Sequence, residues 1–159
     1  MKFVMKKIIE GCVMVFCVTF LSACQPAGED ESPVFSVVRS NNVSRVTQYL
    51  AEGGNPDLQN EDGDALLYVA SGAKGGYDVA RLLLIGGADP NQISREGRTA
   101  LHTAAGWCNT DIVELLLESG AQVDIENDEG KRAIEVVCSQ PRDRRDPVLA
   151  LLRAAEFGS

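Results

Sequence analysis

The side chains of this chain that could do chemistry are five cysteines and a single histidine, His102. A nucleophilic mechanism needs a thiol or hydroxyl beside a general base, and His102 is the only imidazole that could fill that role. The sequence contains no H-E-x-x-H zinc motif, no G-x-S-x-G nucleophile elbow and no Walker phosphate loop. One histidine without converging ligands does not make a metal site. We therefore expect no catalytic residues, no metal, no cofactor and no enzyme activity.

Three of the cysteines lie in or directly after an N-terminal segment built like an export signal. Three lysines within residues 2–7 precede an apolar run, residues 11–21, about half the length that a transmembrane helix needs. The run ends in Leu-Ser-Ala-Cys at residues 21–24, which resembles the lipobox of bacterial lipoproteins, where a peptidase cuts before a lipidated cysteine. We expect residues 1–23 to be a signal peptide and Cys24 to carry lipid. An ordinary secretory signal and a cytoplasmic protein with an apolar start remain alternatives.

The residues after Cys24 predict where the anchored protein would reside. Gln25 follows the cysteine, whereas an Asp there tends to retain Gram-negative lipoproteins at the inner membrane, so the resemblance implies the periplasmic face of the outer membrane. Residues 24–32 are expected to form the lipidated terminus and a short polar tether. Eight extended residues reach about 26 Å, which would keep a domain close to its membrane.

The rest of the chain repeats itself with a period of 33–34 residues. Two sets of glycines keep this spacing, namely Gly63, Gly97 and Gly130, and Gly53, Gly87 and Gly120. Residues 99–102, Thr-Ala-Leu-His, resemble the T-P-L-H box of ankyrin repeats, which have this period. The resemblance covers about residues 33–155 and leaves 156–159 as a tail. It implies an all-α solenoid of about four helix–turn–helix repeats with hairpin fingers, whose surface binds other proteins.

The repeat pattern also predicts the individual elements. We expect paired helices at 34–39 and 43–52, 65–71 and 77–85, and 99–107 and 110–118, then one at 132–139 and a last helix capped by Asp146 with Pro147 in its first position. Leu82, Leu83, Leu115 and Leu116 should form the core of the inner repeats. The resemblance gives His102 a structural role, in which its ring hydrogen-bonds backbone and ties adjacent repeats together.

Two cysteines, Cys108 and Cys138, remain within the repeats. Cys138 aligns with Ala105 of the preceding repeat, and Cys108 lies one helical turn beyond Ala105. The two are then near neighbours across the stack, and in an oxidising compartment such a pair readily forms a disulfide. We predict that bond, with two separate small hydrophobic side chains as the alternative.

The ankyrin resemblance places the binding surface on the fingers and the first helices, which face the concave side. Trp107, Arg95 and Arg98 are the expected anchors, because Trp and Arg are common interface hot spots. The alternative for Trp107 is that it covers the long turn of the fourth repeat. The other expected contact positions are Glu61, Asp62, Asp64, Glu96, Asp128, Glu129 and Lys131 on the fingers, with Tyr68 and Thr103 on the first helices.

Charge narrows the choice of partner. The full chain has 15 basic and 23 acidic residues, a net charge of −8, and without residues 1–23 the net charge is −10. Such a chain is not expected to bind nucleic acid or anionic lipid. The charge suits a basic protein partner, although solubility alone would also explain it.

These features favour a non-catalytic, protein-binding ankyrin lipoprotein of the bacterial periplasm, anchored to its membrane by lipid. It would act as a scaffold or accessory factor for an envelope protein. The alternative is an immunity protein that neutralises a secreted toxic enzyme, such as a lipase, by covering its active site. Small-molecule binding is disfavoured because the sequence suggests no enclosed aromatic pocket.

Overall fold

The computed structural model describes residues 33–158 except for 73–75, 95 and 140–141. The predicted signal peptide, Cys24, the tether and Arg95 lie outside the described residues. Eight helical elements follow one another in the described part: α1 (Pro33–Arg39), α2 (Val43–Ala51), α3 (Leu66–Ala70), α4 (Tyr77–Ile85), α5 (Ala100–Gly106), α6 (Thr110–Glu118), the 3₁₀ helix η1 (Ala133–Glu135) and α7 (Arg142–Gly158). The predicted helix pairs of the first three repeats are present, with limits within one or two residues of those expected.

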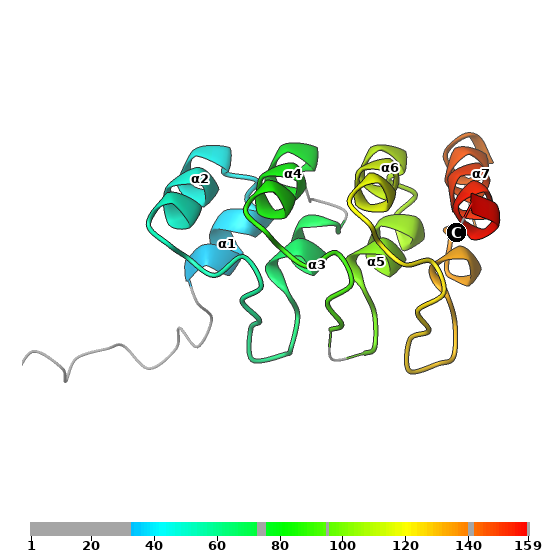
Figure 1. The fold of residues 1–159 in the computed structure, drawn as a ribbon, viewed down its shortest axis with the longest axis horizontal. Helices are drawn as coiled ribbons and strands as arrows, with labels where there is room; N and C mark the ends of the chain where they lie inside the picture. The colour runs from blue at the N-terminus through cyan, green and yellow to red at the C-terminus, as the bar shows by residue number, and fades with distance from the viewer. Residues whose placement is uncertain (1–32, 73–75, 95, 140–141, 159) are drawn as a thin grey trace, which may run out of the picture.

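The elements form two layers of helices with hairpin fingers below them (Figure 1). The inner layer contains α1, α3, α5 and η1, and the outer layer contains α2, α4, α6 and α7. Each helix packs on the equivalent helix of the next repeat, as α2 does on α4 and α3 on α5. Single antiparallel bridges, Gln59–Ala65 and Glu126–Arg132, close the bases of two fingers. The predicted all-α repeat solenoid is confirmed.

The same local signals start and end the helices of successive repeats. The side chains of Asn42 and Asn109 cap α2 and α6 by accepting hydrogen bonds from backbone N–H groups three residues on. Gly53, Gly87 and Gly120 each follow the end of an outer helix with φ between 85° and 94°. No atom lies within 4 Å of where their Cβ would be, so the left-handed backbone, and not lack of space, requires glycine there.

One continuous apolar core runs between the layers. Its largest fully buried side chains include Phe35, Leu66, Leu101, Ile112 and Leu116. Leu83, Leu115 and Leu116 are buried as predicted, whereas Leu82 is only half-buried because it lies at the edge of the outer layer. The small pair Ala104-Ala105 is fully buried and lets α5 pack closely between α3 and η1.

Polar side chains at the bases of the fingers join one repeat to the next. The backbone N–H of Asp89 donates to the Asp57 carboxylate at 2.7 Å. One repeat later, the N–H of Gln122 donates to the Asn91 side chain at 2.8 Å, and that side chain donates to the Gly120 carbonyl at 3.2 Å. Because these bonds connect residues about one repeat apart, they hold the fingers in a fixed register.

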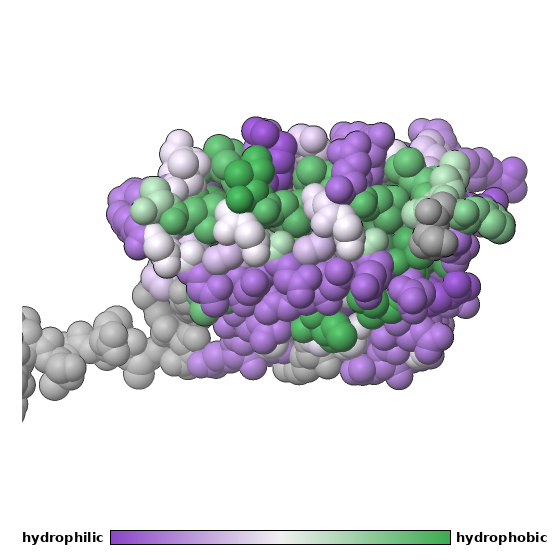
Figure 2. Space-filling view, in the orientation of Figure 1, coloured by the Kyte–Doolittle hydropathy of each residue, from purple (hydrophilic) through white to green (hydrophobic). Residues whose placement is uncertain are grey.

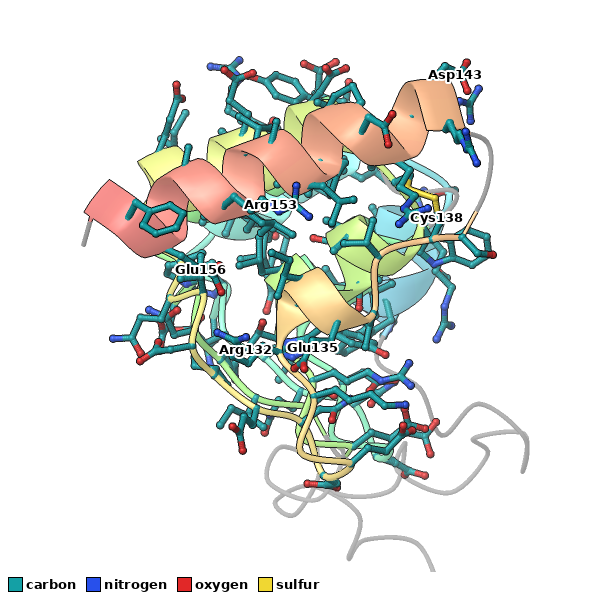
Figure 3. The ribbon with its side chains drawn as sticks, turned by 90° about the vertical axis from the view of Figure 1, so that its right-hand side faces the viewer. Arg132, Glu135, Cys138, Asp143, Arg153 and Glu156 are labelled. Atoms are coloured by element: carbon teal, nitrogen blue, oxygen red, sulfur yellow. A yellow bond between two sulfur atoms is a disulfide. The ribbon has the colours of Figure 1, made fainter. Side chains whose placement is uncertain are left out.

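The fourth repeat departs from three of our expectations. A single 3₁₀ turn, η1, replaces the helix expected at 132–139. Helix α7 begins at Arg142, one turn before the predicted start, so that Pro147 lies inside it and leaves the Asp143 carbonyl without an intrahelical donor. The helix continues to Gly158, so residues 156–158 are not a tail; Glu156 accepts a hydrogen bond from Arg132 at 2.8 Å (Figure 3).

The predicted disulfide joins the third repeat to the fourth. Cys108 and Cys138 are bonded, with their Cα atoms 5.7 Å apart (Figure 3). The backbone N–H of Cys138 also donates to the Ala105 carbonyl at 3.3 Å, the residue with which it was aligned. Cys108 has φ 52°, a left-handed conformation that it shares with Asn41 at the equivalent turn of the first repeat. The bond thus attaches the shortened repeat to a turn that has an unfavourable backbone conformation for a cysteine.

Substitution of the cysteines separates the stabilisation by the disulfide bond from the cost of the left-handed backbone at Cys108. Cys138→Ala should lower the free energy of unfolding by about 3–4 kcal/mol, since the chain-entropy relation gives this value for a loop of about 30 residues. Cys108→Gly combined with Cys138→Ala should regain about 1 kcal/mol, because glycine adopts positive φ at little cost. Urea unfolding of protein made under oxidising conditions measures both values. Unchanged stability of Cys138→Ala would contradict the role of the bond.

Candidate protein-binding surface

Hairpin geometry projects the predicted finger residues from the layers of helices. In the first finger, the Asn60 side chain accepts from the Asp64 N–H at 2.8 Å, and in the third, the Asn127 side chain accepts from the N–H groups of Glu129 and Lys131 at 3.0 Å. These bonds close the backbone into a tight turn. The charged side chains of the turn are therefore directed outward, while Asn127 itself is buried.

Most of the predicted contact positions are accessible. Those that are exposed are Glu61, Asp62, Glu96, Asp128, Glu129 and Lys131, and those that are half-buried are Asp64, Arg98, Tyr68 and Thr103. Arg98 forms an ion pair with Glu96 at 3.4 Å, and Lys131 forms one with Glu129 at 2.7 Å. Each ion pair uses one carboxylate and one basic side chain, and the remaining charged finger positions among the described residues are carboxylates.

The electrostatics of the fingers are consequently acidic. The described finger positions comprise six carboxylates and two basic side chains, a net charge of −4. The hydrogen bond that Lys131 donates lowers the pKa of Glu129, so that carboxylate stays charged over a wider pH range. The third finger is hydrogen-bonded to the second, because the Asp128 N–H donates to the Glu96 carbonyl at 3.2 Å. The acidic side chains of the second and third fingers therefore lie on one edge.

Trp107 caps the C-terminal end of α5 and is 59% exposed. Its backbone N–H donates to the Thr103 carbonyl at 3.0 Å, which fixes its position relative to the inner layer. The indole lines a hollow together with Asp111 and with Arg144 of α7. More than half of the side chain thus remains accessible to a partner.

His102 lies beneath this surface and joins two repeats. Its Nδ1 accepts a hydrogen bond from the Thr99 N–H at 3.2 Å, and its Nε2 is 3.0 Å from the carbonyl oxygen of Lys131 in the next finger. The pattern assigns the neutral tautomer with its proton on Nε2. Burial lowers the pKa of His102; the Lys131 carbonyl opposes this shift and the Arg98 charge adds to it. The structural role implied by the ankyrin resemblance is confirmed.

Sequence reasoning missed a second group of accessible side chains on the outer layer. Tyr77 is 44% exposed at the start of α4, where the next repeat has Thr110. Asp111, Glu114 and Glu118 lie on α6 at spacings of three and four residues, which places them on one helical face. The spacing of the three carboxylates, and an aromatic residue at the exposed first position of α4, could have been recognised from the sequence.

The described residues contain no group of histidine, cysteine, aspartate and glutamate side chains that could hold a metal. Within the same residues no helix has the length and apolar character required to cross a bilayer. Figure 2 shows apolar residues gathered across the outer helices, with polar residues over the finger bases below them.

Comparison with known proteins agrees with this geometry. The family model for ankyrin repeats, in three copies, matches residues 34–127 and 73–158, and the chain belongs to this family. It is 36% identical to an ankyrin repeat protein of fowlpox virus, over 64% of this chain and 24% of the relative. It is 34% identical to an ankyrin repeat-containing protein of Treponema pallidum, over 64% of this chain and 35% of the relative. It is 31% identical to the NF-kappa-B inhibitor cactus of Drosophila melanogaster, over 70% of this chain and 23% of the relative.

This chain thus spans about a third or less of the length of these relatives. The fold and the family together define a repeat protein of the kind that binds other proteins.

The environment of His102 predicts how stability depends on pH. The unfolded chain binds a proton on this imidazole more readily than the folded chain, since the folded-state pKa is lowered. Its contribution to stability is therefore complete above the usual histidine pKa of about 6.5 and declines as the pH falls below it. Denaturant unfolding at pH 7.5 and 5.5 should show lower stability at pH 5.5.

The variant His102→Gln is the control for this dependence. It should lower the free energy of unfolding at pH 7.5 by about 1–3 kcal/mol, because buried backbone groups lose a partner. Its stability should change less between pH 7.5 and 5.5 than that of the natural chain. An equal decline in both proteins would assign the pH dependence to other groups.

Proposed function

We propose that the chain is a protein-binding ankyrin lipoprotein that uses its fingers and inner helices to hold an envelope protein as a scaffold or accessory factor. The observation that carries the proposal is the accessible, acidic finger edge, together with the exposed Trp107 at the C-terminal end of the inner helix α5. Aromatic anchors surrounded by polar side chains are the usual arrangement of an interface hot spot. The net charge of the edge suits a partner with a basic surface.

The periplasmic location is part of this proposal and has two lines of support. The first is the lipobox-like sequence at residues 21–24, which ends at Cys24. The second is the Cys108–Cys138 disulfide, because structural disulfides are typical of oxidising compartments and rare in the bacterial cytoplasm. The two features are independent, since one lies before the repeats and the other within them.

An inhibitory role is the second candidate. The Drosophila relative is named as an inhibitor, and rigid repeats can cover an active site. The two candidates differ in what happens to the partner. Capture from periplasmic and secreted extracts on the immobilised chain should yield one stoichiometric partner. A resident protein that remains active in the complex supports the scaffold, and a secreted enzyme that loses activity supports the immunity protein.

Trp107 provides the direct test of the binding surface. Trp107→Ala should weaken binding of the captured partner by at least about fivefold, corresponding to about 1 kcal/mol, without unfolding the domain. The matched control is Phe157→Ala, because Phe157 is an aromatic side chain with 89% exposure at the end of α7. Calorimetric titration measures both variants. Equal affinities of Trp107→Ala and the natural chain would contradict an anchor role.

Cys24 provides the test of the membrane anchor. In a Gram-negative host, Cys24→Ser should move the protein from the membrane fraction to the soluble fraction, because acyl chains contribute about 0.8 kcal/mol for each buried CH₂. Fractionation and intact mass of the natural chain measure attachment and acylation. The matched control, Cys12→Ser with Cys17→Ser, alters two cysteines of the predicted signal peptide and should leave attachment unchanged. A membrane-bound Cys24→Ser protein would refute the anchor.

A further inference from the structure

The Cys108–Cys138 bond borders a part of the fourth repeat that is held by little side-chain packing. Helix α7 begins four residues after Cys138. Its residues 142–147 are exposed or half-buried, and they include a proline, which donates no backbone hydrogen bond. Burial begins only at Val148 and is complete again at Leu152. The disulfide therefore attaches a stretch of α7 that the apolar core does not hold.

This bond can be reached from solvent. Cys108 is 6% exposed, whereas Cys138 is half-buried, so Cys138 is the more accessible of the two residues. Figure 3 shows Cys138 close to where the chain turns into α7. Disulfides that are accessible exchange with thiols more readily than enclosed ones. The position of the bond thus suits attack by an external thiolate at Cys138.

The surroundings of Cys108 favour it as the sulfur that leaves. Cys108 directly precedes Asn109, the N-cap of α6, so a thiolate there lies at the positive end of that helix. Cys108 also lines a surface hollow with Arg144 and Asp111. Arg144 adds to the stabilisation of a thiolate, and Asp111 opposes it. A better stabilised thiolate leaves faster in thiol–disulfide exchange.

We propose that the Cys108–Cys138 bond is a thiol–disulfide exchange site, and that its reduction by a dithiol releases the start of α7 from the third repeat. One thiolate of the reductant bonds to the Cys138 sulfur, and the electron pair of the S–S bond passes to Cys108. The second thiolate of the reductant then displaces Cys138, and the reductant leaves as a disulfide. The two cysteine thiolates gain the two electrons and take up the two protons that the reductant lost.

Release of α7 changes the surface beside Trp107. Arg144 belongs to the stretch that the bond holds, so the hollow next to Trp107 loses one wall when that stretch moves away. Cys108 has φ 52°, a conformation that cysteine adopts less readily than asparagine, so reduction frees a turn with no strong preference of its own. The first three repeats have buried cores of their own, and we expect the opening to stay local.

Glutathione, a monothiol, tests the direction of attack on the full chain in detergent micelles. Excess glutathione at pH 7, a rapid acid quench and peptide mass spectrometry should find the adduct on Cys138 and a free thiol at Cys108. Arg144→Gln should slow adduct formation by about twofold, and Asp111→Asn should speed it by a similar factor, because exposed charges interact modestly. Arg153→Gln, which alters an exposed arginine further along α7, is the matched control and should leave the rate unchanged.

An adduct on Cys108 in place of Cys138, or no adduct on either cysteine, would overturn the proposal. So would equal rates for the Arg144 and Asp111 variants, because the charges in the hollow would then have no influence on the leaving sulfur.

Amide hydrogen exchange tests the release of α7. After reduction by dithiothreitol without denaturant, peptides that contain Cys138 and residues 146–149 should exchange at least about tenfold faster, while α2 and α4 keep their rates. The fluorescence of Trp107, the only tryptophan, should change as well. Cys138→Ala should show the fast rate with and without the reductant.

A bond that stays intact under dithiothreitol, or unchanged exchange in the reduced chain, would contradict the switch. The switch goes beyond the proposed function and does not rest on it, since none of these measurements needs a partner. Partner capture by the oxidised chain therefore judges the proposed function separately.

Discussion

Packing of one repeat against the next is the interaction on which the whole structure depends. The helices are short, from five residues in α3 to nine in the outer helices of the first three repeats, and helices of this length are not stable alone in water. Each becomes stable only when its apolar face is covered by its neighbour. Ala104 and Ala105 allow close approach on the inner layer, while Leu83 and Leu116 fill the outer one. This stacking sets the positions of the fingers and of the hollows between the helices.

The last face of such a stack must be covered, and the fourth repeat covers it. The inner helix is reduced to the single turn η1, which still packs on α5. The Cys108–Cys138 bond attaches this repeat covalently, and the 17-residue α7 covers α6. Arg132 links η1 to α7 by contacting both Glu135 and Glu156 (Figure 3). A covalent bond and a long helix thus offset the loss of one inner helix.

The sequence predicted the repeats well because their signals are local. Glycine in a left-handed turn and asparagine at a helix start act over a few residues, so their spacing fixes the helix limits. The fourth repeat was harder, since residues 132–139 align with the inner helices of the earlier repeats, although the β-branched side chains of Ile134, Val136 and Val137 disfavour a helix there. The start of α7 before Pro147 was missed for a related reason, because proline is more common in a first turn.

The candidate site also has features that the sequence predicts and features that only the structure shows. Exposure of Glu61, Glu96 and Glu129 follows from the hairpin register and was predictable. The half-buried state of Arg98 and the hollow between α4 and α6, which Tyr77 and Glu114 line, depend on contacts between repeats. That hollow requires α4 and α6 to lie side by side, which the sequence implies only through the stacking. Surface that is formed by one repeat can thus be read from the sequence, whereas surface shared by two repeats needs the structure.

Rigid stacking also fixes how the two surfaces are presented. The described chain begins at Pro33 in the first repeat, and Trp107 and α6 belong to the third (Figure 1). An anchor that precedes Pro33 would hold the first repeat nearest the membrane and leave the third and fourth repeats accessible. The finger edge lies below the inner layer, whereas the hollow between α4 and α6 lies on the outer layer (Figure 1). Trp107 lies apart from both, at the C-terminal end of α5, where it lines a hollow with Asp111 and Arg144.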